Sequence, residues 1–288
     1  MRRLLPLAAY LTAIACAAPA AAQPPVWVVK DADSEMVLFG SVHVLPPGLA
    51  WRPPALTAAL KAADDLWFEL PTGADVERES ARLAGERGVL PPGQSLFARL
   101  PPQDAARLIR VAEAYKVDKA ALDRFEPWLA ELALAGAAFR RSGAGLQDGV
   151  EKAIEAAAPA GAVRQALETP AEQLAIFDEA PEADQLASLR ETVREMDEDP
   201  QAFDKLVAAW AAGDLDMIDR EALQPLRRAS PLLFRRLVDE RNARWTARLD
   251  QRLKGRGRTV VVVGMGHLIG PGGVPARLRA LGYSVTGP

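Results

Sequence analysis

The sequence contains two histidines, and each one closes the same four-residue frame at the end of an apolar run. His43 closes Gly-Ser-Val-His after the run at residues 36–39, and His267 closes Gly-Met-Gly-His after the run at residues 259–263. Short apolar runs bounded by glycine are typical of buried strands in a parallel sheet. Open α/β sheets bind ligands at the carboxyl ends of their strands, and glycine leaves room for a sharp turn there. The repeated frame therefore predicts a paired site.

The N-terminal half predicts the beginning of an α/β fold. Residues 26–30 and 36–42 form two apolar runs separated by a polar turn, and this pattern favours a β-hairpin. A helix is expected from about residue 53 to 63, and an apolar strand follows at residues 66–70. Strand, helix and strand in this order are typical of a parallel βαβ unit.

The C-terminal end repeats that unit, with a strand at residues 259–263, a short helix at 274–281 and a strand at 283–285. The segments between the two ends, about 73–161 and 170–254, show helical periodicity, and a strand at 163–168 separates them. We therefore expect a mixed, mostly parallel sheet built from both chain ends, with a large helical insertion.

The first 22 residues are typical of a secretory signal peptide. Two arginines precede an apolar segment at residues 4–18, and three alanines end at Ala22. The apolar segment is short for a membrane span and is soon followed by proline. We expect cleavage after Ala22, a single domain over residues 23–288, and a periplasmic or secreted protein.

The single cysteine, Cys16, lies within this segment. If Cys16 carried a lipid, the protein would be an anchored lipoprotein, and this is the one route to a membrane that the sequence offers. Cleavage after Ala22 removes every cysteine, which excludes disulfides, a cysteine nucleophile and thiolate metal sites. The formal net charge of −3 gives no general attraction to nucleic acid. The oligomeric state is left open.

Four polar residues end strands in the same way: His43, Glu69, Glu168 and His267. If the strands are parallel neighbours, the four side chains converge on one rim. Two neutral imidazoles and one or two carboxylates suit Zn²⁺, Mn²⁺ or Fe²⁺. The same set also suits metal-free chemistry, with a histidine as general base and a glutamate orienting it.

Each of these residues also has a structural explanation. A histidine at a strand end is often a satisfied polar residue. Glu168 precedes a helix, where the helix dipole favours a carboxylate. The structural explanation is weaker for Glu69. This residue lies in an apolar strand, where burial of an unpaired carboxylate costs roughly several kcal/mol.

A buried arginine is predicted in the last long helix. Every fourth residue from Leu233 to Leu249 is apolar except Arg241. A guanidinium on an apolar stripe pairs with a carboxylate or anion, and Glu69 or Glu168 is the expected partner. The alternative is that its stem is buried and its charged head reaches water.

Several short motifs occur in a fixed order along the mature chain. They are Val-Leu-Phe-Gly-Ser-Val-His at 37–43, Trp-Phe-Glu-Leu at 67–70, Pro-Trp at 127–128, Leu-Glu-Thr at 167–169 with Gln173, Arg-Asn at 241–242 with Trp245, and Val-Gly-Met-Gly-His-Leu at 263–268 followed by Leu-Gly-Tyr at 281–283. In this order the set resembles the TraB/GumN family, whose wider relatives include the Tiki proteases.

The resemblance implies an α/β core with a helical insertion and, for the Tiki branch, metal-dependent peptide hydrolysis. His43, His267 and Glu69 would then be the metal ligands. Family members often have Gly-Val-Asp in mid-chain, where this sequence has Gly-Val-Glu ending at Glu151, so a role for that acid is open.

We therefore expect an exported hydrolase, a peptidase, that depends on a divalent metal ion (Mn, Zn, Co or Fe). Glu168 would be a further ligand or the general base, and Arg241 would orient a carboxylate or stabilise the oxyanion. Its partner would be a peptide or another small substrate. The alternatives are a metal-free hydrolase of the erythromycin-esterase type and a non-catalytic periplasmic binding or assembly factor.

Overall fold

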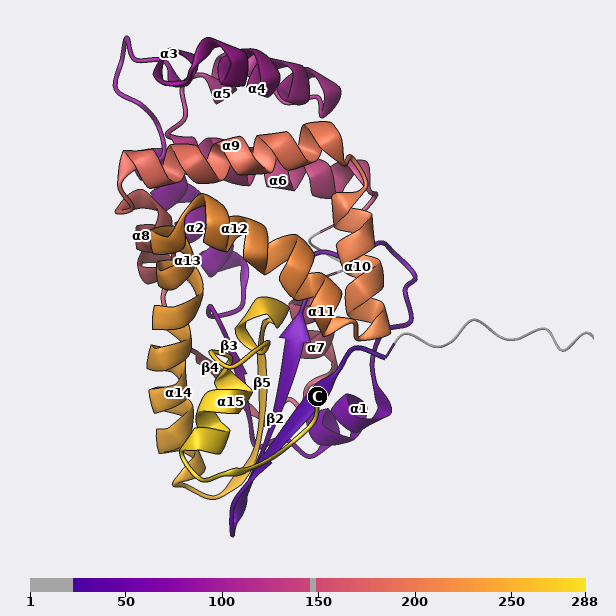
Figure 1. The fold of residues 1–288 in the computed structure, drawn as a ribbon. Coiled ribbons are helices and arrows are strands. Elements are labelled where there is room, and N and C mark those ends of the chain that lie inside the picture. The colour runs from indigo at the N-terminus through magenta and orange to yellow at the C-terminus, as the bar shows by residue number, and fades with distance from the viewer. Residues whose placement is uncertain (1–22, 146–148) are drawn as a thin grey trace, which may run out of the picture.

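A computed structural model describes residues 23–145 and 149–288, so the expected signal peptide and Cys16 lie outside the described residues. The sheet occupies one end of the molecule and a stack of helices the other (Figure 1). Within the two described ranges, no helix combines the length and apolar character that a membrane crossing requires.

The six strands form one sheet in the order β4-β3-β5-β2-β1-β6. Only β1 runs against its neighbours; the other five strands run in one direction. Because β5 lies between β2 and β3, both chain ends build the sheet, as the sequence predicts. The strands are β1 (Val26–Lys30), β2 (Ser34–Ser41), β3 (Asp65–Phe68), β4 (Val163–Ala166), β5 (Gly257–Gly264) and β6 (Ser284–Thr286).

The register of β2 on β5 sets the position of the two histidine frames. Phe39 pairs with Val262 and Ser41 pairs with Gly264, so both frames leave adjacent strands at the same edge. The paired runs are buried at every position, as expected for strands of a parallel sheet that is covered on both faces.

Four of the helices between β3 and β4 share a separate core with one helix from the next segment. Leu108, Leu134 and Leu189 are central to it, and it is separate from the core around the sheet. These helices are α3 (Leu96–Arg99), α4 (Pro102–Ala114), α5 (Lys119–Leu122) and α6 (Pro127–Arg141), joined by α9 (Glu182–Glu198) from the next segment. Helix α2 (Ala74–Arg87) precedes them, and α7 (Val150–Ala157) places Val150 and Ile154 in the core around the sheet.

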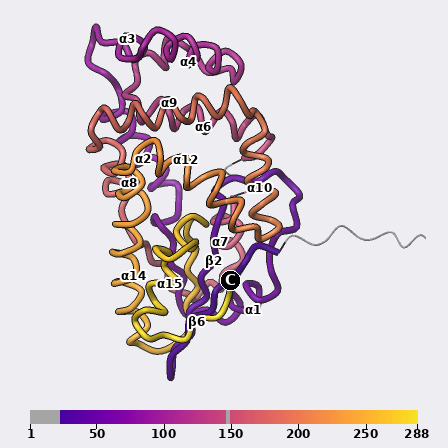
Figure 2. Tube along the Cα trace, in the orientation of Figure 1, coloured from indigo at the N-terminus to yellow at the C-terminus, as the bar shows by residue number. Residues whose placement is uncertain are grey.

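The segment between β4 and β5 returns from this helical part to the sheet. Figure 2 shows this segment passing from the helical part into a long helical run, which ends with a helix beside the sheet. Its other elements are α8 (Pro170–Asp178), α10 (Ala202–Ala212), α11 (Leu215–Ile218), the π-helical turn η2 (Asp219–Leu223), α12 (Gln224–Ala229), α13 (Pro231–Phe234), the π-helical turn η3 (Arg235–Asp239) and α14 (Glu240–Leu253). The remaining elements lie next to the sheet: α1 (Pro54–Lys61), the 3₁₀ turn η4 (Met265–His267) and α15 (Val274–Ala280).

Helix α10 joins the helical part to the first histidine frame. The Trp210 indole is buried and donates to the Gly40 carbonyl at 2.8 Å. Its ring lies 6.3 Å from Phe39 and 5.8 Å from Trp51, centroid to centroid.

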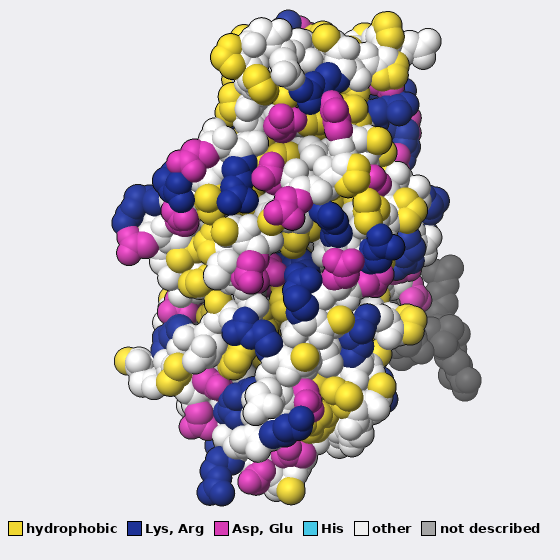
Figure 3. Space-filling model, turned by 90° about the vertical axis from the view of Figure 1, so that its left-hand side faces the viewer, with side chains coloured by type: hydrophobic (Ala, Val, Ile, Leu, Met, Phe, Trp, Pro, Cys, Tyr) yellow, Lys and Arg dark blue, Asp and Glu magenta, His cyan; other side chains and the backbone are white. Residues whose placement is uncertain are grey.

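The face that carries α8 and α14 shows basic and acidic side chains interspersed (Figure 3).

Candidate functional site

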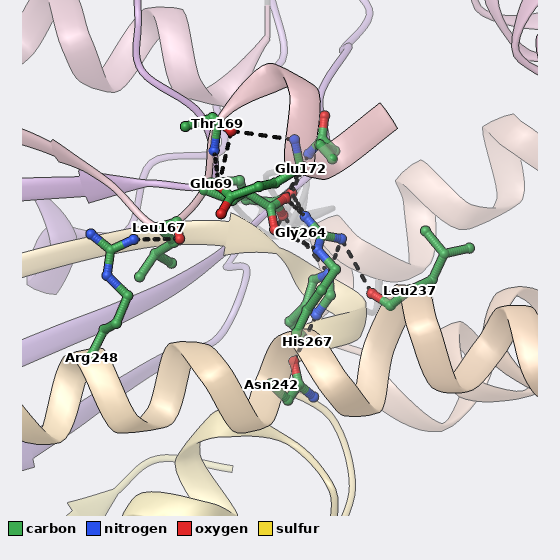
Figure 4. Close-up of polar contacts among 12 residues, drawn as sticks. Glu69, Leu167, Thr169, Glu172, Leu237, Asn242, Arg248, Gly264 and His267 are labelled. Atoms are coloured by element: carbon green, nitrogen blue, oxygen red, sulfur yellow. Dashed lines mark hydrogen bonds and ion pairs between the residues drawn. The ribbon is translucent and has the colours of Figure 1, made fainter. Parts of the chain in front are cut away.

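The four strand-end residues meet at one rim of the sheet. Backbone pairing continues beyond the strands, because the Glu168 N–H donates to the Glu69 carbonyl at 2.9 Å. Glu69, Gly264 and His267 lie together at the strand ends, and Asn242 on α14 lies on the other side of the imidazole (Figure 4). The convergence that the sequence predicts is therefore present in the fold.

Arg241 lies at the centre of the rim, with 4 % of its surface exposed. Its Nη2 is 2.5 Å from Glu69 Oε2 and also donates to Glu168 Oε1, while its Nε donates to Glu168 Oε2 at 3.1 Å. The guanidinium thus pairs with both carboxylates, where the sequence predicted a pair with one of them. Such charges are tolerated in the interior because each one is paired and hydrogen-bonded.

The remaining N–H groups of Arg241 are also occupied. Its Nη1 donates to the Leu237 carbonyl at 3.2 Å and to His267 Nε2 at 3.0 Å. Since a guanidinium carries five N–H donors, none is left for a substrate in this arrangement. Arg241 therefore acts here as a positioning residue for the two carboxylates and the imidazole.

The π-helical turn η3 ends two residues before Arg241 and supplies one of its partners. Leu237, whose carbonyl receives the guanidinium, is a residue of η3. Single π-helical turns change the phase of the residues that follow and are frequent at functional sites. The second such turn, η2, packs against the other side of the rim, where a Cβ on Gly266 would come within 2.9 Å of Leu223.

His267 is buried and held in one tautomer. Asn242 donates its Nδ2 to the Gly272 carbonyl at 2.9 Å, which turns its Oδ1 toward His267 Nδ1 at 2.7 Å. The Nδ1 atom must therefore carry the proton, because Nε2 accepts from Arg241, which can only donate. Burial lowers the pKa of His267 to about 3, so this imidazole is neutral.

His43 has the opposite surroundings. Its side chain is 62 % exposed, and its Nδ1 lies 2.8 Å from Glu151 Oε1, which also accepts from the Ser41 hydroxyl at 2.6 Å. The Glu151 carboxylate raises the pKa of His43 to about 9. No hydrogen bond joins its Nε2 to any residue of the described ranges, so this nitrogen faces solvent.

The two glutamates are fully engaged. Glu69 Oε1 accepts from the Gly264 N–H at 2.6 Å, and Gln173 Nε2 bridges Glu69 and Glu168 at 3.2 and 3.1 Å. Burial alone would raise the pKa of Glu69, but Arg241 and the other positive and N–H groups outweigh it and hold that pKa at about 2. Glu69 is therefore an ionised, weakly basic carboxylate.

The expected metal ligands His43, Glu69 and His267 share this rim, but their atoms are not free to bind a metal ion together. Arg241 donates to both His267 Nε2 and Glu69 Oε2, so a positive guanidinium lies where a metal cation would have to bind. Across residues 23–145 and 149–288, no group of three or more His, Cys, Asp or Glu side chains is arranged to hold a metal ion. In this arrangement the donor set does not fit a metal.

Two contacts at the rim were not predicted from the sequence. Glu151 comes from α7 and reaches His43 because the loop after His43 pairs with the preceding segment through a bridge between Leu45 and Gly145. Its only signal was its place in the mid-chain Gly-Val-Glu motif. Trp210, which holds the Gly40 carbonyl, had no signal beyond an apolar helix.

The comparisons with known proteins bear on the whole chain. The model of the TraB/PrgY/gumN family matches residues 25–287. No curated protein and no solved structure gives a significant match. The family match covers the sheet, the helical insertion and every rim residue, so the chain belongs to the TraB/PrgY/gumN family.

Proposed function

We propose that the protein is a hydrolase in which His43 moves the proton of the attacking water. One observation carries the proposal: His43 is the rim residue with a free ring nitrogen open to solvent, while its other nitrogen is held by Glu151 at 2.8 Å. The buried rim residues have no such free atom, because each is engaged with Arg241, Asn242, Gln173 or the backbone.

In the proposed reaction, unprotonated Nε2 of His43 takes a proton from water as the oxygen attacks the substrate carbonyl. The imidazolium that forms is stabilised by the Glu151 carboxylate and then returns the proton to the leaving group. General acid–base catalysis of this kind contributes roughly 10²- to 10⁴-fold in rate. Because Glu151 raises the pKa of His43, activity should rise with pH up to about 9.

The proposed substrate class is the peptide bond, which is what the resemblance to the Tiki proteases implies. The proposed compartment is the periplasm or the exterior, on the basis of the signal-peptide pattern in residues 1–22. Both proposals rest on the sequence.

A metal-dependent form of the same hydrolase is the second candidate, with His43, Glu69 and His267 as ligands. One observation favours it: both histidines present Nδ1 to an oxygen acceptor, so Nε2 is the nitrogen that the neutral imidazole would offer to a metal ion. Metal-binding histidines are usually held in this way. Arg241 would have to release His267 and Glu69 first.

The test is hydrolysis of a mixture of unstructured peptides, followed by mass spectrometry, before and after treatment with EDTA. We expect His43→Gln to lower the rate at least about 100-fold. The matched control Lys30→Gln removes a positive charge at the opposite end of the sheet and should leave the rate unchanged. The Glu151→Gln variant should move the rise of activity with pH to a lower pH.

The outcomes separate the candidates. Activity that survives EDTA and is lost in His43→Gln supports the metal-free reaction. Activity that EDTA abolishes and Mn²⁺ or Zn²⁺ restores would replace it with the metal-dependent one. A protein that binds peptides without cleaving them would contradict both and indicate a binding or assembly role.

A further inference from the structure

A cavity of about 610 Å³ lies in the helical part of the molecule. It is lined by the C-terminal ends of α6 and α9 and by the first turns of α10, and it includes none of the rim residues. Its volume lies within the range of small-molecule sites, which is roughly 300–1,000 Å³.

Aromatic rings from three elements form the apolar wall of the cavity. Phe139 from α6 and Phe203 from α10 lie 4.8 Å apart, centroid to centroid, so the two helices are tied together there. Tyr115, at the end of α4, is buried, and its hydroxyl donates to the Met196 carbonyl at 3.3 Å. Fixed aromatic rings offer the negative faces that attract cations.

Two carboxylates at the cavity form no ion pair with another described residue. Glu195 lines the cavity, and Glu131 lies behind Thr192, a lining residue whose hydroxyl donates to Glu131 at 2.8 Å. Neither glutamate forms an ion pair within the part of the chain that the structure describes. Burial raises the pKa of both groups, as expected for carboxylates without a counter-ion.

The other charges at the cavity are partly compensated. Asp199 is paired with Lys205 at 2.5 Å, whereas the exposed Asp204 forms no ion pair with a described residue. The single cation among the described lining residues is Arg141, whose guanidinium lies over the Tyr115 ring at 4.8 Å. Negative charge therefore remains in excess at the cavity.

We propose that this cavity binds a small organic cation with an apolar body, of the class of quaternary or protonated amines. The apolar body would contact Phe139 and Phe203, and the charge would lie near Glu195 and toward Glu131. An anion of the same size would meet uncompensated carboxylates instead. This proposal is independent of the hydrolytic function.

The test is calorimetric titration of the purified chain with benzyltrimethylammonium. We expect one site, with Glu195→Gln weakening the affinity about tenfold through the lost charge. Ala138→Trp, which places an indole in the cavity, should abolish binding. Glu198→Gln is the matched control, because Glu198 is on the same helix, is paired with Arg194 at 2.5 Å and does not line the cavity. It should leave the affinity unchanged.

Two outcomes would overturn the proposal. One is phenylpropionate, an anion of similar size, binding as tightly as the cation. The other is Glu195→Gln binding the cation as the unsubstituted protein does, a readout that remains valid if Ala138→Trp fails to fold. His43→Gln should retain the binding, so a failed hydrolase assay would leave this result standing.

Discussion

The two histidine frames have the same spacing and leave adjacent strands at the same edge, yet their imidazoles have opposite surroundings. His43 is largely exposed and faces a carboxylate, which raises its pKa to about 9. His267 is buried and faces a guanidinium and an amide, and its pKa is lowered to about 3. The frame fixes where an imidazole lies, whereas burial and partners determine its charge.

The buried side of the rim, around Arg241, and the exposed side, at His43, differ in their bonding. The buried side is a closed network in which Arg241 is bonded to two carboxylates and one imidazole. The exposed side keeps one nitrogen atom free. We expect substitutions on the buried side to change stability first, and substitutions on the exposed side to change activity first.

The largest expected effect is that of Arg241→Ala on stability. The substitution leaves Glu69 and Glu168 buried without a counter-ion, which should lower the free energy of unfolding by about 3–5 kcal/mol. Urea unfolding measures this change. The control is Arg235→Ala, six residues earlier, whose ion pair with Glu240 is exposed and should contribute less than about 1 kcal/mol. Equal losses in the two variants would refute the closed network.

A smaller effect should appear as a dependence of stability on pH. Because the pKa of His267 is lowered in the folded state, the unfolded chain binds this proton first as the pH falls below 6.5. The free energy of unfolding should therefore fall toward acid pH, by at most about 1.4 kcal/mol per pH unit for one proton. Urea unfolding between pH 7 and 5 covers this window before Glu69 is protonated.

The His267→Gln variant should lack this part of the slope. His43 has the opposite sign: its raised pKa gives stability that is present below pH 6.5 and lost as the pH rises through about 9. A slope that is unchanged in His267→Gln would mean that His267 is not held neutral by burial.

Much of the fold and part of the site could be predicted from the sequence. The apolar runs that precede each frame predicted buried strands at both chain ends. The four-residue period of the last helix predicted that Arg241 would point inward. These are local patterns whose physical cause lies within a few residues.

The partners of the rim residues could not be predicted in the same way. Glu151 contacts His43 across 108 positions of sequence, close to the bridge between Leu45 and Gly145, and the mid-chain motif that contains Glu151 does not indicate its partner. The π-helical turn before Arg241 rotates the residues that follow it around the helix axis by less than one turn. The spacing of apolar residues over so short a segment does not reveal such a rotation. The joint pairing of Arg241 with two carboxylates depends on the order of the strands.

The most direct test of the account is an NMR titration of the two imidazoles, with labelled histidine and His43→Gln for assignment. In the unsubstituted protein we expect one imidazole to titrate near pH 9 and the other to remain neutral, with its proton on Nδ1, from pH 5 to 10. In Glu151→Gln the first pKa should fall toward its ordinary value of about 6.5. Two imidazoles that both titrate near 6.5, or a first pKa that Glu151→Gln does not change, would contradict the account.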